Sequence, residues 1–285
     1  MRPVIFKIFL GLAVILCAIC VPAIAQVSSS THAYSWLSSY DSNQSIENRI
    51  APPAGYERTA CASGSFCDWL RNLQLKQPGS PVLHYDGTIK HGAASHAVID
   101  IDTGKKDLQQ CADAVMRLKA EYHYGQQEFN RIHFNFTSGH KVSFNDWRRG
   151  KKPIVSGNKV KFSGANSKTD NSYGNFKKYM TIIFSYAGTL SLSKEMKSVD
   201  IADIRVGDVF VWGGSPGHAV LVIDVAKNDA GQKMFMLAQS YMPAQDMHIL
   251  TNPFHPGEGP WYSAEFENEL FTPEWRFVKA DLKRF

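Results

Sequence analysis

The sequence predicts an α+β fold, in which helices precede a strand-rich C-terminal half. The strongest helical patterns lie at residues 107–124 and 173–187, and apolar strands dominate residues 206–238. Helices and strands segregated in this way indicate an antiparallel sheet packed against helices. With 285 residues, 44% of them hydrophobic and 20% charged, the chain has the composition of a globular protein and can bury a sizeable core.

The N-terminal segment has the pattern of a secretory signal peptide spanning residues 1–25. A basic start at Arg2 and Lys7 precedes an apolar run at 9–21 and a small-x-small site at 23–25. No second apolar run is long enough to cross a bilayer. We therefore expect a mature protein without a stable membrane span, exported to the periplasm or the extracellular space and associated with the cell envelope.

Charge argues against a nucleic-acid partner. The formal net charge of +5 falls to +3 once Arg2 and Lys7 leave with the signal. The remaining excess is local, in the basic turn at 147–153, which is more typical of a solvated turn than of a dedicated anion site.

The mature chain is predicted to contain a polar N-terminal arm and one domain. Residues 26–58 are rich in polar side chains and are broken by two prolines, so they form the arm. Residues 59–285 form a single α+β domain with a polar insertion at about 134–175. Within the domain, the apolar spacing at 66–75 predicts a short helix.

Three of the five cysteines remain after removal of the signal. Cys61 and Cys67 lie six residues apart in a Gly/Ser-rich loop, and an oxidising compartment would allow them to pair. Cys17 and Cys20 belong to the signal, where the bulky residue before each disfavours a lipid anchor. Cys111 is left as an odd thiol, which is either packed in the core or used chemically.

Cys111 lies near the start of the predicted helix at 107–124. Asp107 can cap that helix, with Gln110 completing an Asp-x-x-Gln capping box. Unpaired backbone N–H groups and the helix dipole favour a thiolate at this end. Such a nucleophile also needs a base and a group that orients the base.

His218 is the candidate base. It follows a Gly/Pro turn at 213–217 and leads an apolar strand. If the turn at 228–231 pairs Lys227 with Gln232, Gln239 and Tyr241 share the face of His218, because side chains alternate along a strand. We expect Gln239, with Tyr241 as the second candidate, to accept from Nδ1–H of His218 and to leave Nε2 free as the base.

Simpler interpretations exist for each of these residues. Cys111 can be a core residue, His218 a structural histidine, and Gln239 a partner of loop backbone.

The other histidines are scattered without a zinc-binding spacing, so no metal is predicted. A phosphate-binding glycine loop is absent from the sequence, and no cofactor is predicted.

Three stretches, at 107–122, 207–220 and 237–245, resemble the DUF4846 family of exported bacterial proteins. A looser likeness connects the chain to NlpC/P60-type cysteine peptidases, which order a helix-borne Cys, a strand-end His and a polar residue on the next strand. This likeness implies a papain-like core, with Cys111, His218 and Gln239 in those positions. The chain departs from the Asp-Cys-Ser pattern of that group, and its long Cys-to-His separation would be absorbed by the insertion.

Together these observations predict an exported cysteine hydrolase that cleaves cell-wall peptide or a similar amide. Cys111 would attack, His218 would move the proton and Gln239 would orient it. Tyr241, Trp212 and Trp147 are the expected substrate-binding residues. The alternative is a non-catalytic envelope or surface protein that binds glycan or peptide in an aromatic groove formed by Trp261, Tyr262 and Trp275.

Overall fold

The computed structural model of this chain describes residues 1, 3, 34–164, 168–255, 257 and 259–285. The predicted signal peptide, its two cysteines and the first part of the predicted arm lie outside the described residues. Within the described ranges, no helix is both long enough and apolar enough to cross a membrane.

A nine-stranded antiparallel sheet forms the centre of the unit that spans residues 32–285. Strand β9 lies in its middle and is the longest, and every neighbour of β9 pairs with it antiparallel. The strands follow the order β2 (Ser95–Val98), β11 (His248–Leu250), β10 (Lys233–Gln239), β9 (His218–Lys227), β8 (Val209–Trp212), β15 (Leu282–Arg284) and β7 (Lys197–Ser198), while β1 (Glu57–Arg58) also pairs with β9 and β12 (Trp261–Ser263) with β10.

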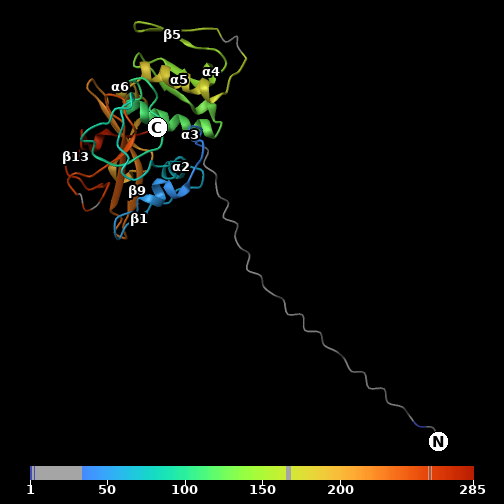
Figure 1. Ribbon diagram of the computed structural model, residues 1–285, viewed down its shortest axis with the longest axis vertical. Coiled ribbons are helices and arrows are strands. Elements are labelled where there is room, and N and C mark those ends of the chain that lie inside the picture. The colour runs from blue at the N-terminus through green and yellow to red at the C-terminus, as the bar shows by residue number, and fades with distance from the viewer. Residues whose placement is uncertain (2, 4–33, 165–167, 256, 258) are drawn as a thin grey trace. The chain divides into compact units, whose positions relative to one another are not determined.

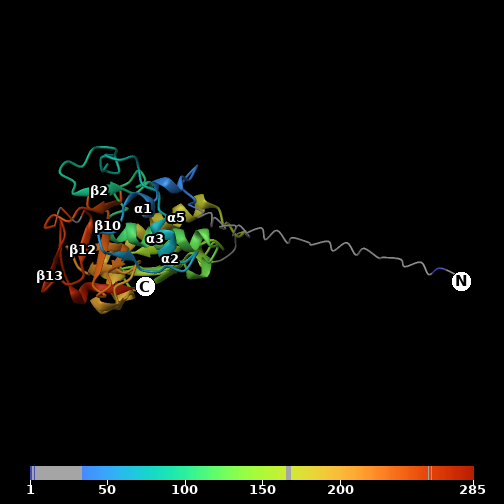
Figure 2. The same cartoon turned by 90° about the horizontal axis from the view of Figure 1, so that it is seen from below.

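Helices cover one face of this sheet, as Figures 1 and 2 show, with α3 packed against β9 and β10. The α-helices are α1 (Ile46–Arg49), α2 (Phe66–Arg71), α3 (Cys111–Gly125), α4 (Phe144–Trp147), α5 (Tyr173–Tyr186) and α6 (Thr189–Glu195). Short 3₁₀ turns lie at η1 (Ser42–Gln44), η2 (Phe129–Arg131), η3 (Ile201–Asp203) and η5 (Lys279–Asp281). The α+β class is therefore as the sequence predicts.

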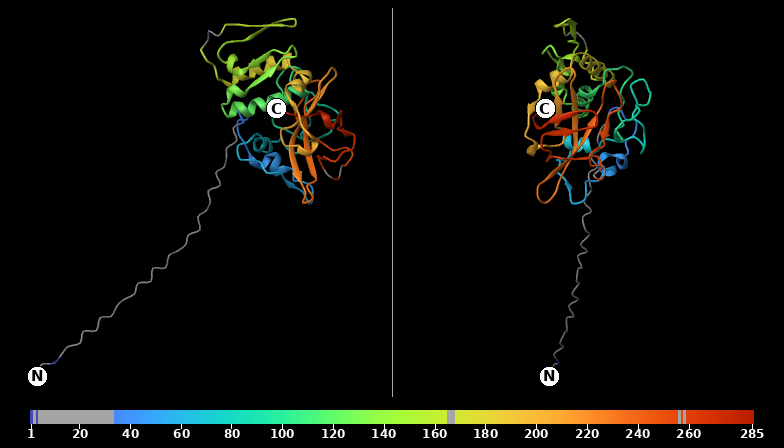
Figure 3. Two further views of the ribbon diagram at one scale, coloured as in Figure 1. Left: turned by 180° about the vertical axis from the view of Figure 1, so that it is seen from behind. Right: turned by 90° about the vertical axis from the view of Figure 1, so that its left-hand side faces the viewer.

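The opposite face of the sheet is covered by the C-terminal segment, which includes the hairpin of β13 (Glu269–Phe271) and β14 (Arg276–Val278) (Figure 3). Alternation along β9 explains why both faces are buried. Ala219 and Leu221 belong to the larger core under the helices, whereas Val220 and Val222 belong to a second core under the C-terminal segment. A strand covered on both faces reads as a continuous apolar run, as β9 does.

The hairpin of β9 and β10 has the predicted register only at one end. Lys227 pairs with Lys233 rather than with Gln232. A bulge before Leu237 then shifts the pairing by one residue, and Leu237 pairs with Val222 as the predicted register requires. The end of the hairpin that carries His218 therefore has the register expected from the sequence.

The two longer predicted helices are present, but the ends of other elements differ. α5 matches the predicted helix at 173–187. The helix predicted at 66–75 ends at Arg71, where Asn72 leaves the helical conformation. The helix α6, which follows Gly188, was not predicted, because its short run of Ser and Leu has no clear apolar period.

The predicted insertion consists of two hairpins and a short helix. β3 (His133–Asn135) pairs with β4 (Lys141–Ser143), and β5 (Pro153–Ser156) pairs with β6 (Lys159–Phe162). Helix α4 lies between the two hairpins. The described part of the polar arm packs on the domain, since Tyr34 and Ile46 are buried in the larger core.

Candidate functional site

Cys111 is the first residue of α3, and the helix begins later than the sequence predicts. The N-cap is Gln110, whose backbone N–H donates to Asp113 Oδ2 at 3.2 Å, so the predicted cap at Asp107 is wrong. Asp107 instead accepts from the Gln110 side chain at 3.0 Å and from Ala244 N–H at 2.7 Å. These bonds fix the loop that leads into Cys111.

The thiol of Cys111 is buried beside the start of β9. Only 6% of the residue is exposed, and the backbone N–H of Ala219 points at the sulfur. This contact places the sulfur at the start of β9. This position is next to His218, the residue that precedes Ala219.

Burial raises the pKa of the Cys111 thiol to about 11, and the nearby Asp113 adds to the increase. The N–H groups of Ala219 and of the helix start act in the opposite direction but are outweighed. The expectation that the helix start produces a thiolate is therefore wrong for the protein without substrate. Cys111 is the free cysteine of the described residues, since Cys61 and Cys67 form a disulfide.

His218 and Gln239 are joined by a hydrogen bond, with His218 Nε2 lying 2.8 Å from Gln239 Oε1. His218 is 1% exposed, and burial lowers its pKa to about 4, so the ring is neutral near pH 7. Its Nδ1 is buried without a hydrogen-bond partner among the described residues. The two ring nitrogens thus have the reverse of the predicted roles, because Gln239 binds Nε2 and leaves Nδ1 free.

Two residues that the sequence did not indicate continue this hydrogen-bonded chain. The Gln239 side-chain amide donates to the carboxylate of Glu274, and Glu274 is also paired with Lys90. A carboxylate can only accept, so it fixes the amide with Nε2 toward Glu274 and Oε1 toward His218. His218 Nε2 must then carry the hydrogen, and the lone pair of the neutral ring is on Nδ1.

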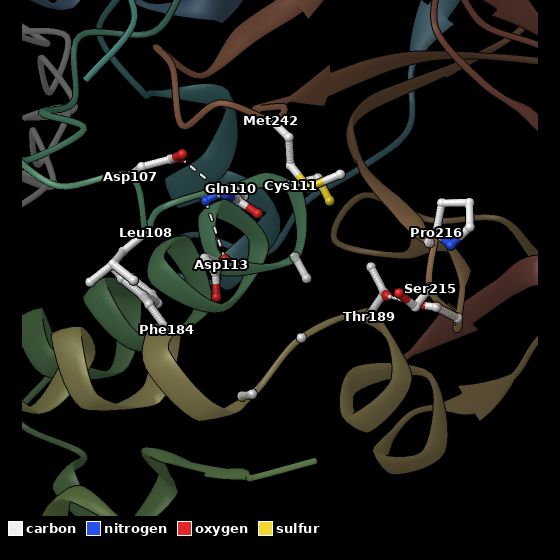
Figure 4. A pocket seen from close by; sticks show the side chains of 15 residues that line it. Asp107, Leu108, Gln110, Cys111, Asp113, Phe184, Thr189, Ser215, Pro216 and Met242 are labelled. Atoms are coloured by element: carbon white, nitrogen blue, oxygen red, sulfur yellow. Dashed lines mark hydrogen bonds between the residues drawn. The ribbon is translucent and has the colours of Figure 1, made fainter. Parts of the chain in front are cut away.

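A cavity of about 240 Å³ lies beside Cys111 (Figure 4). Figure 4 shows Cys111 and Met242 together on one side of it, with Ser215 and Pro216 across from them. The α3 start, the loop from α5 to α6 and the loop from β8 to β9 supply the wall. Gly217 has to be glycine here, since a Cβ atom would lie 2.3 Å from Thr189 Oγ1.

The structure brings only some of the other predicted residues to this region. The Tyr241 ring meets the His218 ring edge-on at 5.0 Å, with the Lys90 ammonium 5.1 Å from the Tyr241 centroid. Trp212 pairs with His218 across β8 and β9 and is 47% exposed, but it does not line the cavity. Trp147 is buried in α4, where its indole donates to Asn175 at 3.0 Å, so it does not line the cavity either.

The expected aromatic groove is not formed by the residues named for it. Trp261 and Tyr262 are buried, and their polar groups donate to Ala51 O and Thr251 O inside the domain. Their ring faces therefore belong to the core rather than to an open surface. Trp275 is half-buried and packs on the His218 ring at 5.6 Å, which makes it part of the wall around the imidazole.

The described part of the chain contains no group of three or more His, Cys, Asp or Glu side chains placed to hold a metal ion. The thiol of Cys111 and the free Nδ1 of His218 are groups that can support nucleophilic attack and proton transfer.

Comparison with known proteins adds a family but no activity. No curated protein and no solved structure matches the chain. The model of the family DUF4846, described as a domain of unknown function, matches residues 46–284 and so includes the cavity, the thiol and the hydrogen-bonded chain behind His218. This protein belongs to the DUF4846 family.

Proposed function

We propose that this protein is an exported cysteine hydrolase that cleaves an amide bond, with a peptide of the cell wall as the leading substrate class. The proposal follows the likeness to NlpC/P60-type peptidases and their papain-like core. In its support, a thiol begins a helix, an imidazole begins a strand, and an amide on the next strand binds the imidazole. The Cys61–Cys67 disulfide is consistent with an oxidising compartment.

One observation carries the proposal, namely the state of the His218 ring. Leaving a buried nitrogen without a partner is unfavourable, yet Nδ1 has none among the described residues while Nε2 is held by Gln239. His84, His133 and His248 also keep one buried nitrogen unpaired among the described residues, so this state supports a base only together with the position of His218 next to Ala219, whose N–H points at the Cys111 sulfur. A general base needs one nitrogen anchored and the other free to take a proton.

The proposed reaction starts from a neutral thiol and a neutral imidazole. His218 Nδ1 takes the thiol proton while the sulfur forms a bond to the amide carbonyl carbon. The C–N bond then breaks, His218 gives the proton to the leaving nitrogen, and an amine departs from a thioester on Cys111. Water attacks the thioester with His218 as base, the C–S bond breaks, the sulfur regains its proton, and the carboxylic acid leaves.

The backbone at the start of α3 would stabilise the oxyanion. The N–H groups of Cys111 and Ala112 are directed at the sulfur, and the first N–H groups of a helix have no partner within the helix. Donors of this kind favour the negative charge that develops on the carbonyl oxygen. These N–H groups can therefore stabilise the oxyanion, because the neutral thiol of the protein without substrate is only a weak acceptor for them.

The closest approach of thiol and imidazole is expected in the substrate complex. No hydrogen bond joins Cys111 to His218 among the described residues, and catalytic hydrogen bonds are often loose before substrate binds. A substrate in the cavity would exclude water around the sulfur. Proton transfer to Nδ1 would then be coupled to attack, as the raised thiol pKa requires.

The test is hydrolysis of purified peptidoglycan stem peptides, followed by mass spectrometry of the products. The mature protein should release new amine and carboxyl ends, and Cys111→Ala and His218→Ala should each lose about 10⁴-fold or more of kcat. Ser156→Ala, at an exposed position on β5, is the matched control and should keep full activity. Cleavage by Cys111→Ala at the wild-type rate would disprove the hydrolase.

One observation favours a second function, a non-catalytic binding protein. Burial holds Cys111 as a thiol, which also suits a residue that only packs. In that case peptide would bind in the cavity beside Cys111 rather than in an aromatic groove. Binding of stem peptides without any product from wild-type protein would support this second function.

A further inference from the structure

A cavity of about 350 Å³ lies along strand β2 and shares no described lining residue with the cavity beside Cys111. Its walls are the four residues of β2, Arg49 at the end of α1, and parts of the loop segments 77–82 and 89–93. Figure 2 shows β2 at the margin of the sheet, beside the loops that precede it. The volume lies within the roughly 300–1,000 Å³ of small-ligand sites, so the cavity can hold a short ligand.

The charged groups of this cavity are all basic. Arg49, Lys90, His91 and His96 belong to the lining, and no described Asp or Glu does. Lys90 is already paired with Glu274, so its charge is largely balanced. Arg49 forms no ion pair with any described residue. The Arg49 guanidinium is therefore the main unbalanced charge that a ligand meets in this cavity.

The Arg49 side chain is held so that one edge of its guanidinium is unused. Nη1 donates to Lys76 O and, at 3.4 Å, to Gln44 Oε1. Nε and Nη2 have no hydrogen-bond partner among the described residues. The N–H groups of these two nitrogens lie along one planar edge, which matches the two oxygens of a carboxylate. Arg49 is therefore oriented for a carboxylate ligand.

His96 supplies backbone groups close to Arg49. The register of β2 skips His96, because Ala97 and Ser95 pair with adjacent residues of β11. The extra residue of such a bulge is left out of the ladder, so its N–H and C=O are available to a peptide group. Burial lowers the pKa of His96, and the charge of Arg49 adds to this decrease, so the charge of Arg49 reaches the His96 ring.

We propose that this cavity binds the carboxylate of a short peptide on the free edge of Arg49, with a neighbouring peptide group on the His96 backbone. This is a second ligand site, and it does not rest on the proposed hydrolase. The carboxylate can be at the C-terminus or on an acidic side chain, since both offer the same two acceptor oxygens. A ligand end with an ammonium group would instead be repelled by Arg49.

The test measures peptide binding to the Cys111→Ala protein, so that turnover cannot remove the ligand. Three probes are compared by calorimetry at pH 7: N-acetyl-valyl-alanyl-alanine, its C-terminal amide, and N-acetyl-valyl-glutamyl-alanine amide. At least one carboxylate probe should bind about tenfold or more tightly than the neutral amide, as a charge-assisted hydrogen bond predicts. Which of the two does so identifies the source of the carboxylate.

Adding Arg49→Gln should remove this preference and leave the affinity for the neutral amide within about twofold, because Gln offers neither the charge nor the paired N–H edge. Arg131→Gln is the matched control and should keep the preference, since the Arg131 side chain is 62% exposed and outside this cavity. With Arg49 intact, the backbone amide signal of His96 in ¹⁵N NMR should move as the carboxylate probe binds.

Three results would overturn the inference. The first is equal binding of the three probes, and the second is a preference for carboxylate that survives in Arg49→Gln. The third is a His96 amide signal that does not move when the carboxylate probe is bound. Tighter binding of inorganic phosphate than of either carboxylate probe would also count against a peptide ligand.

Discussion

Cys111 and His218 are both held in their neutral forms by burial. The thiol pKa is raised to about 11 and the imidazole pKa is lowered to about 4, so neither group is ionised near pH 7. This differs from a preformed thiolate–imidazolium pair, in which the thiol pKa lies far below its ordinary value. Reactivity of Cys111 should therefore depend strongly on pH and on what fills the cavity.

The first prediction concerns alkylation of Cys111 by iodoacetamide. Because only the thiolate reacts, the rate should rise about tenfold for each pH unit between about pH 7 and pH 10, without a plateau in that range. Mass spectrometry of the native protein follows the label, and Cys111→Ala gives the background from any other thiol. A rate that levels off near neutral pH would contradict the raised pKa and reveal a resident thiolate.

The second prediction concerns Glu274 and Lys90, which act on His218 in opposite directions. The charge of Glu274 raises the pKa of His218, and the charge of Lys90 lowers it. Since His218 must be neutral to act as the base, the acid limb of the kcat/KM profile should move to lower pH in Glu274→Gln and to higher pH in Lys90→Met. An NMR titration of His218 should show the same two displacements without reference to activity.

Glu274→Gln should also lower kcat, for a geometric reason. An amide at 274 can donate as well as accept, so it no longer dictates the orientation of the Gln239 amide. Gln239 can then turn its NH₂ group toward His218 and favour the tautomer with the hydrogen on Nδ1, which cannot accept the thiol proton. Displacements of both variants in the same direction, or unchanged kcat in Glu274→Gln, would count against Glu274 as a positioning residue.

At the scale of elements, a buried carboxylate on β9 anchors the segments that precede the site. Asp224 is fully buried and accepts from the guanidinium groups of Arg58 in β1 and Arg71 in α2, each at 2.6 Å. The polar arm and the first helix of the domain are thereby attached to the same strand that carries His218. Sequence periodicity gives no sign of this link, because the three residues lie far apart in the chain.

The third prediction is that Asp224→Asn lowers the free energy of unfolding by about 3–5 kcal/mol, since it leaves two guanidinium groups without their charge partner in the interior. Urea denaturation measures the change. Glu269→Gln is the matched control, because the exposed Glu269–Arg276 pair at 3.8 Å should contribute less than about 1 kcal/mol. Similar losses in both variants would show that burial of the ion pair is not what matters.

At the scale of the whole molecule, the candidate site depends on both faces of the sheet. The thiol comes from α3, which packs on the face with the larger core. The His218 ring instead packs on Phe277 at 5.9 Å, a member of the second core, and Glu274 reaches Gln239 from the same C-terminal segment. The two cores therefore both have to form before the thiol and the imidazole are each held in place.

The fourth prediction is that His218 and His123 each destabilise the protein on mild acidification. Burial lowers the pKa of His218 and of His123 to about 4 in the folded state, below the value of about 6.5 in an unfolded chain. Between these pH values the unfolded chain binds more protons at these two positions, so each histidine lowers the free energy of unfolding as pH decreases. The buried carboxyl groups of Asp113, Glu121, Glu195 and Asp281 have raised pKa values and act in the opposite direction. Each histidine contributes at most about 1.4 kcal/mol per pH unit.

Urea midpoints at several pH values between 4 and 7 test this expectation. His218→Gln and His123→Gln should each lower the slope of the free energy of unfolding against pH, whatever they do to stability at neutral pH. A pH dependence that is the same in wild-type protein and in both variants would contradict the lowered histidine pKa values.

The sequence by itself determined the α+β class, the α5 helix and the face that His218 shares with Gln239, and it offered Cys61 and Cys67 as a possible disulfide. These features follow from local spacing and from the alternation of side chains along a strand. The turn at 228–231 adds the register near His218, which agrees with the predicted register after the bulge before Leu237. The sequence could not give the cap at Gln110, because Asp107 fits the capping pattern and only the tertiary structure shows that its carboxyl group accepts from the Gln110 side chain and from Ala244 N–H instead.

Only the tertiary structure decided which nitrogen of His218 is free and what holds the other. That choice depends on Glu274 and Lys90, which are remote in sequence from His218 and reach it only through Gln239. It also decided the burial that keeps Cys111 protonated and that encloses the rings of Trp261 and Tyr262. Burial and long-range hydrogen bonds arise from packing of distant segments, and local sequence patterns do not encode them.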